Sequence, residues 1–276
     1  MPKFASNLTM LFNELPFLDR FAASASAGFD GVEYLFPYAF PARVLAERLR
    51  ASGLTQVLHN LPAGNWDGGE RGIAVLPDRI DEFRDGVTKA LEYAQVLGCT
   101  QLNCLAGIAP RESDGARLRA TFVENLRFAA AILASEGIKL LIEPINTRDI
   151  PGFYLNHTQA ALDVIKDVGS SNLYLQYDIY HMQIMEGDLA RTIQANLARI
   201  AHVQIADNPG RNEPGSGEIH YPFLFEHLDR IGYTGWVGCE YKPATTTLEG
   251  LKWYASYAAA PAANAAPAGH AAPARR

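Results

Sequence analysis

Four oxygen-bearing side chains recur along this sequence at the spacing of one repeating structural unit. Glu143 lies in KLLIEPIN, Asp178 in LYLQYDIYH, Gln204 in AHVQIADN and Glu240 in WVGCEYKP, and neighbouring members are 26 to 36 residues apart. Each lies near the carboxyl end of an apolar run. Because side chains alternate between the two faces of a strand, all four can point to one side. Three carboxylates and an amide oxygen predict a site for a hard divalent cation, Mg2+ or Mn2+, which would offset the repulsion between the carboxylates.

Four more polar residues are expected near the same rim, where a substrate would bind. His181 follows Asp178 by three positions, His59 lies near the end of another apolar run, and Lys242 follows Glu240 by two. Arg211 lies in the glycine-rich stretch ADNPGRNEPGSGE, and a guanidinium matches an anionic substrate bidentately. For His59 and Lys242 the alternative interpretation is a hydrogen-bonded residue at the barrel rim without a substrate role. For Arg211 the alternative is a solvent-exposed loop charge.

The elements that must position these groups are eight short apolar runs, each typical of a buried parallel strand. The runs are Phe4–Met10, Gly31–Phe36, Thr55–Asn60, Gln101–Ala106, Lys139–Ile145, Leu173–Asp178, Ile200–Ala206 and Trp236–Tyr241. Helical patterns alternate with them at Pro16–Ala27, Pro41–Ser52, Pro77–Leu97, Asp114–Glu136, His157–Val168, Asp188–Leu197, Tyr221–Ile231 and Thr247–Tyr257. Glycines after several of these patterns are typical helix ends.

Eight strand–helix units of even length favour an α/β fold of the (β/α)8 TIM-barrel type over a doubly wound sheet. We expect a single barrel domain over residues 1–257. The Ala- and Pro-rich stretch 258–276 has no apolar periodicity and is expected to be a disordered tail. In a barrel the active site lies at the carboxyl ends of the strands, where the four oxygen-bearing residues are placed.

Composition narrows the functional class further. The chain has 276 residues, a net charge of −6 and no basic run apart from its last two residues, so a nucleic-acid partner is not expected. Its three cysteines contain no Cys-x-x-Cys pair and favour free buried thiols. With no signal-like start and no membrane-spanning run, we expect a cytoplasmic protein without a membrane partner. Homo-oligomerisation is left open.

Longer motifs resemble the hydroxypyruvate isomerase family of the xylose-isomerase-like barrels. They cover nearly the whole chain except the tail: ASNLTMLF at 5–12, GVEYLFPY at 31–38, LHNLPAGNW at 58–66, GERGIA at 69–74, LIEPINTRDIPGF at 141–153, QYDIYHMQ at 176–183, HVQIADNPGRNEPGSGEI at 202–219 and GWVGCEYKP at 235–243. The resemblance implies that Glu143 and Glu240 are the paired acid/base residues. It also implies that they ligate the metal with Asp178 and Gln204. Related ketose 3-epimerases usually have a histidine at the position of Gln204. The resemblance therefore implies that the glutamine would weaken metal binding in this protein.

The resemblance implies an aldose–ketose type isomerisation of a small hydroxy-keto acid. Hydroxypyruvate would lose a proton from C3, pass through a metal-stabilised enediolate and gain a proton at C2, giving 2-hydroxy-3-oxopropanoate (tartronate semialdehyde). In this reading the protein serves glyoxylate metabolism. A 2-oxo-tetronate isomerase is the alternative in a sister group, and a ketose 3-epimerase would use the same two glutamates on a longer sugar. A DNA repair enzyme on the same barrel would need a histidine-rich zinc site and a cationic face.

Overall fold

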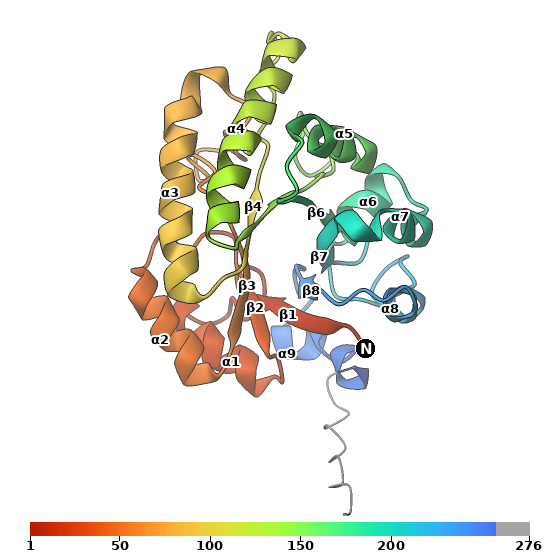
Figure 1. Ribbon diagram of the computed structural model, residues 1–276. Helices are drawn as coiled ribbons and strands as arrows, with labels where there is room; N and C mark the ends of the chain where they lie inside the picture. The colour runs from red at the N-terminus through yellow and green to blue at the C-terminus, as the bar shows by residue number, and fades with distance from the viewer. Residues whose placement is uncertain (258–276) are drawn as a thin grey trace, which may run out of the picture.

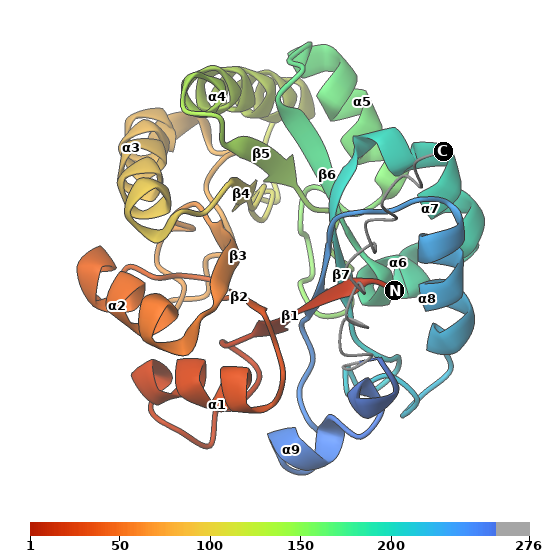
Figure 2. The ribbon, with the colours of Figure 1, turned by 60° about the horizontal axis from the view of Figure 1, so that its bottom comes forward.

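Eight parallel strands close into a barrel in the order of the chain, which confirms the predicted fold (Figures 1 and 2). The computed structural model describes residues 1–257. The strands are β1 (Lys3–Asn7), β2 (Gly31–Glu33), β3 (Thr55–Asn60), β4 (Gln101–Cys104), β5 (Lys139–Ile142), β6 (Leu173–Asp178), β7 (Ile200–Ile205) and β8 (Trp236–Cys239). Parallel pairing of β1 with β8 closes the ring. The predicted tail, 258–276, lies outside the described residues.

Helices form a ring around the strands, as the view in Figure 2 shows. They are α1 (Arg20–Ser26), α2 (Ala42–Ser52), α3 (Ile80–Leu97), α4 (Gly115–Ser135), α5 (Thr158–Val168), α6 (Ile179–Met185), α7 (Leu189–Asn196), α8 (Tyr221–Arg230) and α9 (Thr247–Gly250). Short 3-10 turns are η1 (Phe17–Asp19), η2 (Pro77–Arg79), η3 (Leu197–Arg199) and η4 (Tyr254–Ser256). Gly98 and Gly169 end α3 and α5 with left-handed φ angles of 66° and 69°, a conformation that glycine adopts without steric cost.

The predicted strands Phe4–Met10, Gly31–Phe36, Gln101–Ala106 and Lys139–Ile145 end two or three residues beyond β1, β2, β4 and β5. Two helical segments differ more from the expectation. The pattern at Thr247–Tyr257 predicted one helix, but the chain forms the short α9 and then η4. Helix α6 was not predicted because it begins directly at the end of β6, with no turn residues between them. Asp178 makes this junction: its side chain accepts hydrogen bonds from the backbone N–H groups of Tyr180 and His181.

Apolar layers fill both sides of the strand ring. Most buried apolar residues lie between strands and helices in one large cluster, while Ala5, Val57, Leu58 and Leu141 form a second, smaller cluster. Leu141 precedes Glu143 by two positions, so the barrel changes from apolar to polar toward the carboxyl ends of its strands. No helix within residues 1–257 has the length and apolar character needed to cross a membrane.

Aromatic residues of the last described segment pack onto the barrel. Phe4 of β1 meets Trp253 and Tyr254 with ring centroids 5.4 and 5.7 Å apart, and Phe225 of α8 meets Tyr257 at 5.0 Å. These edge-on contacts are favourable arrangements for aromatic rings. Trp253, Tyr254 and Tyr257 therefore have an intramolecular packing role, which needs no subunit contact to explain it.

Candidate active site

A cavity of about 750 Å3 lies at the carboxyl ends of the strands. Six of the residues predicted for the site line it: Glu143, His181, Gln204, Arg211, Glu240 and Lys242. Of the two other predicted residues, Asp178 is completely buried beside them, and His59 lies elsewhere. Strands β5 and β8 end one residue before Glu143 and Glu240, so these two glutamates project from the first positions beyond the barrel wall.

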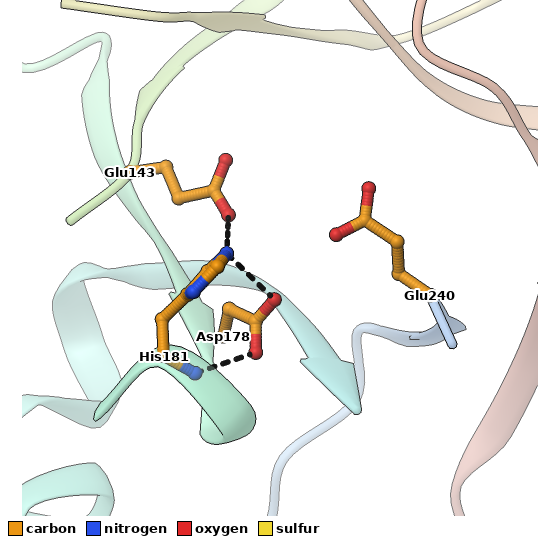
Figure 3. A group of neighbouring side chains, drawn as sticks. All are labelled: Glu143, Asp178, His181 and Glu240. Carbon is orange, nitrogen blue, oxygen red and sulfur yellow. Dashed lines mark hydrogen bonds and ion pairs between the residues drawn. The ribbon is translucent and has the colours of Figure 1, made fainter. Parts of the chain in front are cut away.

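Four acidic and imidazole groups converge closely enough to hold a metal ion. Glu143, Asp178, His181 and Glu240 each offer a ligand atom, and these atoms all lie within 4.8 Å of one another. In Figure 3 the Glu143 and Glu240 carboxylates extend into the same space from opposite sides, and His181 and Asp178 lie below Glu143. Asp178 Oδ2 has no hydrogen-bond partner among residues 1–257. A buried, unpartnered carboxylate oxygen beside two more carboxylates fits a cation.

Burial and like charge raise the pKa values of these carboxyl groups. Loss of water is the first cause of the raised pKa of Glu143, and the nearby Glu240 and Asp178 charges add to it. Burial also raises the pKa values of Glu240 and Asp178, while the Arg211 guanidinium opposes both shifts. The three carboxyl groups therefore bind protons more readily than exposed carboxyl groups do, which is a property expected of acid/base residues.

His181 is held with one defined ring nitrogen toward the acidic groups. Asn146 Oδ1 accepts hydrogen bonds from the backbone N–H groups of Arg148 (3.0 Å) and Asp149 (2.7 Å). The Asn146 Nδ2 group is therefore the one that lies 2.7 Å from His181 Nδ1 and donates to it. Burial lowers the pKa of His181 well below its usual value, so the ring is neutral and its proton lies on Nε2. That Nε2 is 3.6 Å from Asp178 Oδ2.

Glu33, at the end of β2, is a buried acidic residue that the sequence analysis did not select. Its Oε1 accepts hydrogen bonds from Asn7 Nδ2 (3.0 Å) and Gln204 Nε2 (2.8 Å), and its Oε2 is 2.6 Å from His202 Nε2. Asn7 Nδ2 also donates to Glu240 Oε1 at 3.3 Å. Glu33 thus links Asn7 of β1 with His202 and Gln204 of β7 through hydrogen bonds. The signal that could have found it was present, since GVEY places an acidic residue at a strand end.

Gln204 lies in the cavity wall with its amide orientation fixed. Its Nε2 donates to Glu33, and its Oε1 accepts a 2.6 Å hydrogen bond from Gln176 Nε2. A carbonyl oxygen has two lone pairs, so one remains available for a cation or a substrate hydroxyl group.

Arg211 reaches the cavity from the loop after β7 and is already paired with acidic residues. Its Nη2 donates to Glu240 Oε2 at 2.8 Å, and its Nη1 lies 3.6 Å from Asp149 Oδ2. The guanidinium also lies 5.1 Å from the centroid of the Tyr180 ring. Asp207, completely buried, holds this loop by accepting hydrogen bonds from several of its backbone N–H groups. Arg211 is therefore a preset cation rather than a solvated loop charge.

His59 is not brought to the cavity, contrary to the predicted substrate contact. Leu58 and Asn60 line the cavity, so the alternation along β3 turns the His59 side chain toward the surrounding helices. His59 is completely buried, and neither ring nitrogen has a hydrogen-bond partner among the described residues. Loss of water lowers its pKa to about 3. Lys242, by contrast, lies at the cavity wall as an exposed residue.

A closed barrel of eight parallel strands with an acidic cluster at the carboxyl ends of its strands defines the class of protein. The chain belongs to the xylose isomerase-like TIM barrel family, whose model matches residues 21–257. It is 54% identical over 257 residues to a hydroxypyruvate isomerase of Escherichia coli K12, covering 93% of this chain and 100% of that protein. It is 51% identical over 257 residues to a 2-oxo-tetronate isomerase of Cupriavidus necator, covering 93% and 99%.

A solved structure agrees with this assignment of the fold. The crystal structure titled AP endonuclease, family 2, from Brucella melitensis is 50% identical and superposes with a TM-score of 0.91, covering 93% of this chain and 99% of that one. The family predicted from the sequence motifs is therefore confirmed, and the curated relatives are named as isomerases.

Proposed function

We propose that this protein is a hydroxypyruvate isomerase that interconverts hydroxypyruvate and 2-hydroxy-3-oxopropanoate. The observation that carries the proposal is the pair of buried carboxyl groups, Glu143 and Glu240, which approach one space from opposite sides of the barrel mouth (Figure 3). Two such groups can remove a carbon-bound proton and return one to the neighbouring carbon. The similarity to the Escherichia coli enzyme named for this activity supports the choice of substrate.

A divalent cation, Mg2+ or Mn2+, is proposed as the cofactor. The carboxylates of Glu143, Asp178 and Glu240 would hold it, with the free lone pair of Gln204 Oε1 completing the oxygen set. Bound there, the ion would supply positive charge for the oxygens of the developing enediolate. His181 donates from Nε2 in its neutral form, so we assign it to a substrate oxygen rather than to the ion.

Proton movement in the proposed reaction balances without an oxidant or reductant. Glu143 or Glu240 takes a proton from C3, and a proton is returned to C2 by the same or the facing carboxyl group. The hydroxyl hydrogen passes from the C3 oxygen to the C2 oxygen. The C2 ketone thereby becomes a secondary alcohol, and C3 becomes an aldehyde. General acid–base action of this kind is worth about 10²–10⁴-fold in rate per group. Arg211 and Lys242, which line the cavity, are proposed to contact substrate oxygens.

Product formation by the purified protein, with Mg2+ or Mn2+ added, tests the proposal. We expect turnover of hydroxypyruvate with a higher kcat/KM than for 2-oxo-tetronate, and loss of turnover in Glu143→Gln and Glu240→Gln with the fold retained. Glu47→Gln, on the exposed side of α2, is the matched control and is expected to act like the wild type. Wild-type activity in either active-site variant would overturn the assignment of those glutamates.

Preference for 2-oxo-tetronate would instead favour the activity named for the Cupriavidus necator relative, with the same glutamates and cation. Turnover of ketohexoses alone would favour a 3-epimerase. We further propose a cytoplasmic enzyme of small hydroxy-keto acids with no nucleic-acid partner, consistent with the net charge of −6.

A further inference from the structure

We propose that Arg71 binds the carboxylate group of the substrate and thereby selects acids over uncharged ketoses. This inference rests on the proposed function and names a specificity residue for the same cavity. Arg71 lies in the loop after β3, within GERGIA, and lines the cavity together with Trp66. It belongs to neither the predicted substrate contacts nor the group that could hold a metal ion.

The Arg71 guanidinium is held in one position by its own loop. Its Nη1 donates to the backbone carbonyl oxygens of Trp66 (2.9 Å) and Glu70 (2.7 Å). The guanidinium carbon lies 4.1 Å from the centroid of the Trp66 ring, and that ring contacts Phe36 at 4.9 Å. A cation stacked on an aromatic ring and bonded to two carbonyl groups loses little freedom when it binds an anion.

The charge of Arg71 and one edge of its guanidinium group are available to a ligand. Among residues 1–257 it forms no ion pair, and its Nε and Nη2 atoms donate no hydrogen bond. The adjacent Glu70 does not neutralise it, because the Glu70 carboxylate binds Arg79 and the backbone N–H of Asn65. The free Nε–Nη2 edge has the fork geometry that binds a carboxylate through two parallel hydrogen bonds.

The other cations of the cavity are less suited to this task. Arg211 already pairs with Glu240 and Asp149, so its charge is largely compensated before substrate binds. Lys242 is exposed and offers a point charge on a flexible chain rather than a planar fork. A carboxylate is the group that hydroxypyruvate and 2-oxo-tetronate share and that a simple ketose lacks. An unpaired arginine in the cavity therefore accounts for an acid substrate.

Arg71→Gln and Arg71→Lys test the proposal when two substrates that differ in this group are compared. Hydroxypyruvate carries the carboxylate, whereas dihydroxyacetone has an uncharged CH2OH group in its place and undergoes the same type of isomerisation. We expect kcat/KM for hydroxypyruvate to fall roughly 10- to 100-fold, mainly through KM, as for a lost charge-assisted hydrogen bond. The value for dihydroxyacetone should stay within about twofold. Arg84→Gln is the matched control, because Arg84 also stacks on an aromatic ring, Phe128, but lies outside the cavity.

Equal losses of kcat/KM for the two substrates would show that Arg71 only supports its loop. An unchanged KM for hydroxypyruvate would show that another group binds the carboxylate. Either result overturns the proposal. Calorimetric titration with glycerate, compared with glycerol, gives a readout independent of turnover. The wild type should bind glycerate, and Arg71→Gln should bind it at least 10-fold more weakly. Failure of the wild type to isomerise any acid would refute the proposed function, while equal glycerate binding by both proteins would refute only the role of Arg71.

Discussion

The burial of His59 leads to a quantitative prediction about stability in acid. The pKa of this side chain is lowered from 6.5 to about 3 because burial removes water from the ring. A histidine with a lowered pKa in the folded state makes the protein lose stability as pH falls below 6.5, since the unfolded chain binds a proton that the folded chain excludes. At pH 5 the loss is about 2 kcal/mol, from ~1.4 kcal/mol per pH unit. For a chain of this size that corresponds to roughly 4–8 °C in Tm.

His59→Leu removes the titrating group and keeps an apolar side chain of similar size. We expect the fall in Tm between pH 8 and pH 5 to be smaller by about 4–8 °C in the variant than in the wild type, measured by differential scanning calorimetry. Comparing each protein with itself at pH 8 removes any packing difference. His157→Leu, at an exposed histidine, should show the wild-type fall. KM for hydroxypyruvate should not change, because His59 lies outside the cavity.

A raised KM in His59→Leu, together with the wild-type fall in Tm, would refute this reasoning. That result would place the ring in contact with the substrate, as the sequence alone predicted, and would contradict the orientation of β3.

Three further predictions concern the cavity. In Asn146→Asp the carboxylate would accept a hydrogen bond from His181 Nδ1 instead of donating one to it, which favours the tautomer with the proton on Nδ1. Loss of the Nε2 donor should lower kcat at least about 10-fold. ¹⁵N spectra of His181 should show the proton moved to Nδ1, and a wild-type spectrum would contradict the assigned tautomer. Gly238→Ala would place a Cβ 2.3 Å from the Glu33 carboxylate, so the free energy of unfolding in urea should fall by about 1–3 kcal/mol, whereas unchanged stability would mean that Glu33 moves freely. Because burial raises the pKa values of Glu143, Asp178 and Glu240, protons compete with the cation. Calorimetric affinity for Mn2+ should therefore rise from pH 6 to pH 8, and a flat profile would argue against these ligands.

The alternation of strands and helices was readable from the sequence because each element carries its own local signal. Apolar runs marked β3 and β6 with their observed bounds, and glycines marked the ends of α3 and α5. The join of β6 to α6 was missed because Asp178 serves at once as the last strand residue and as the helix cap, so no turn residues separate the two patterns.

The four oxygen-bearing residues could be found because barrel closure turns a regular spacing into proximity. Glu143, Asp178, Gln204 and Glu240 each lie at or near the carboxyl end of a strand, and parallel strands in a closed barrel bring these ends to one rim. The types of these residues and their spacing therefore determined that an oxygen-rich site would form, before any contact was known.

The contacts within the site were decided by tertiary structure alone. Alternation along β3 permits either His59 or its neighbours Leu58 and Asn60 to face the cavity, and the choice depends on how β3 meets β2, where the register shifts. Glu33 meets His202 across 169 positions of sequence. The physical reason is that secondary structure follows from local periodicity, whereas the phase of each strand and the neighbours of each buried polar group are set only when the barrel closes and brings distant strands together.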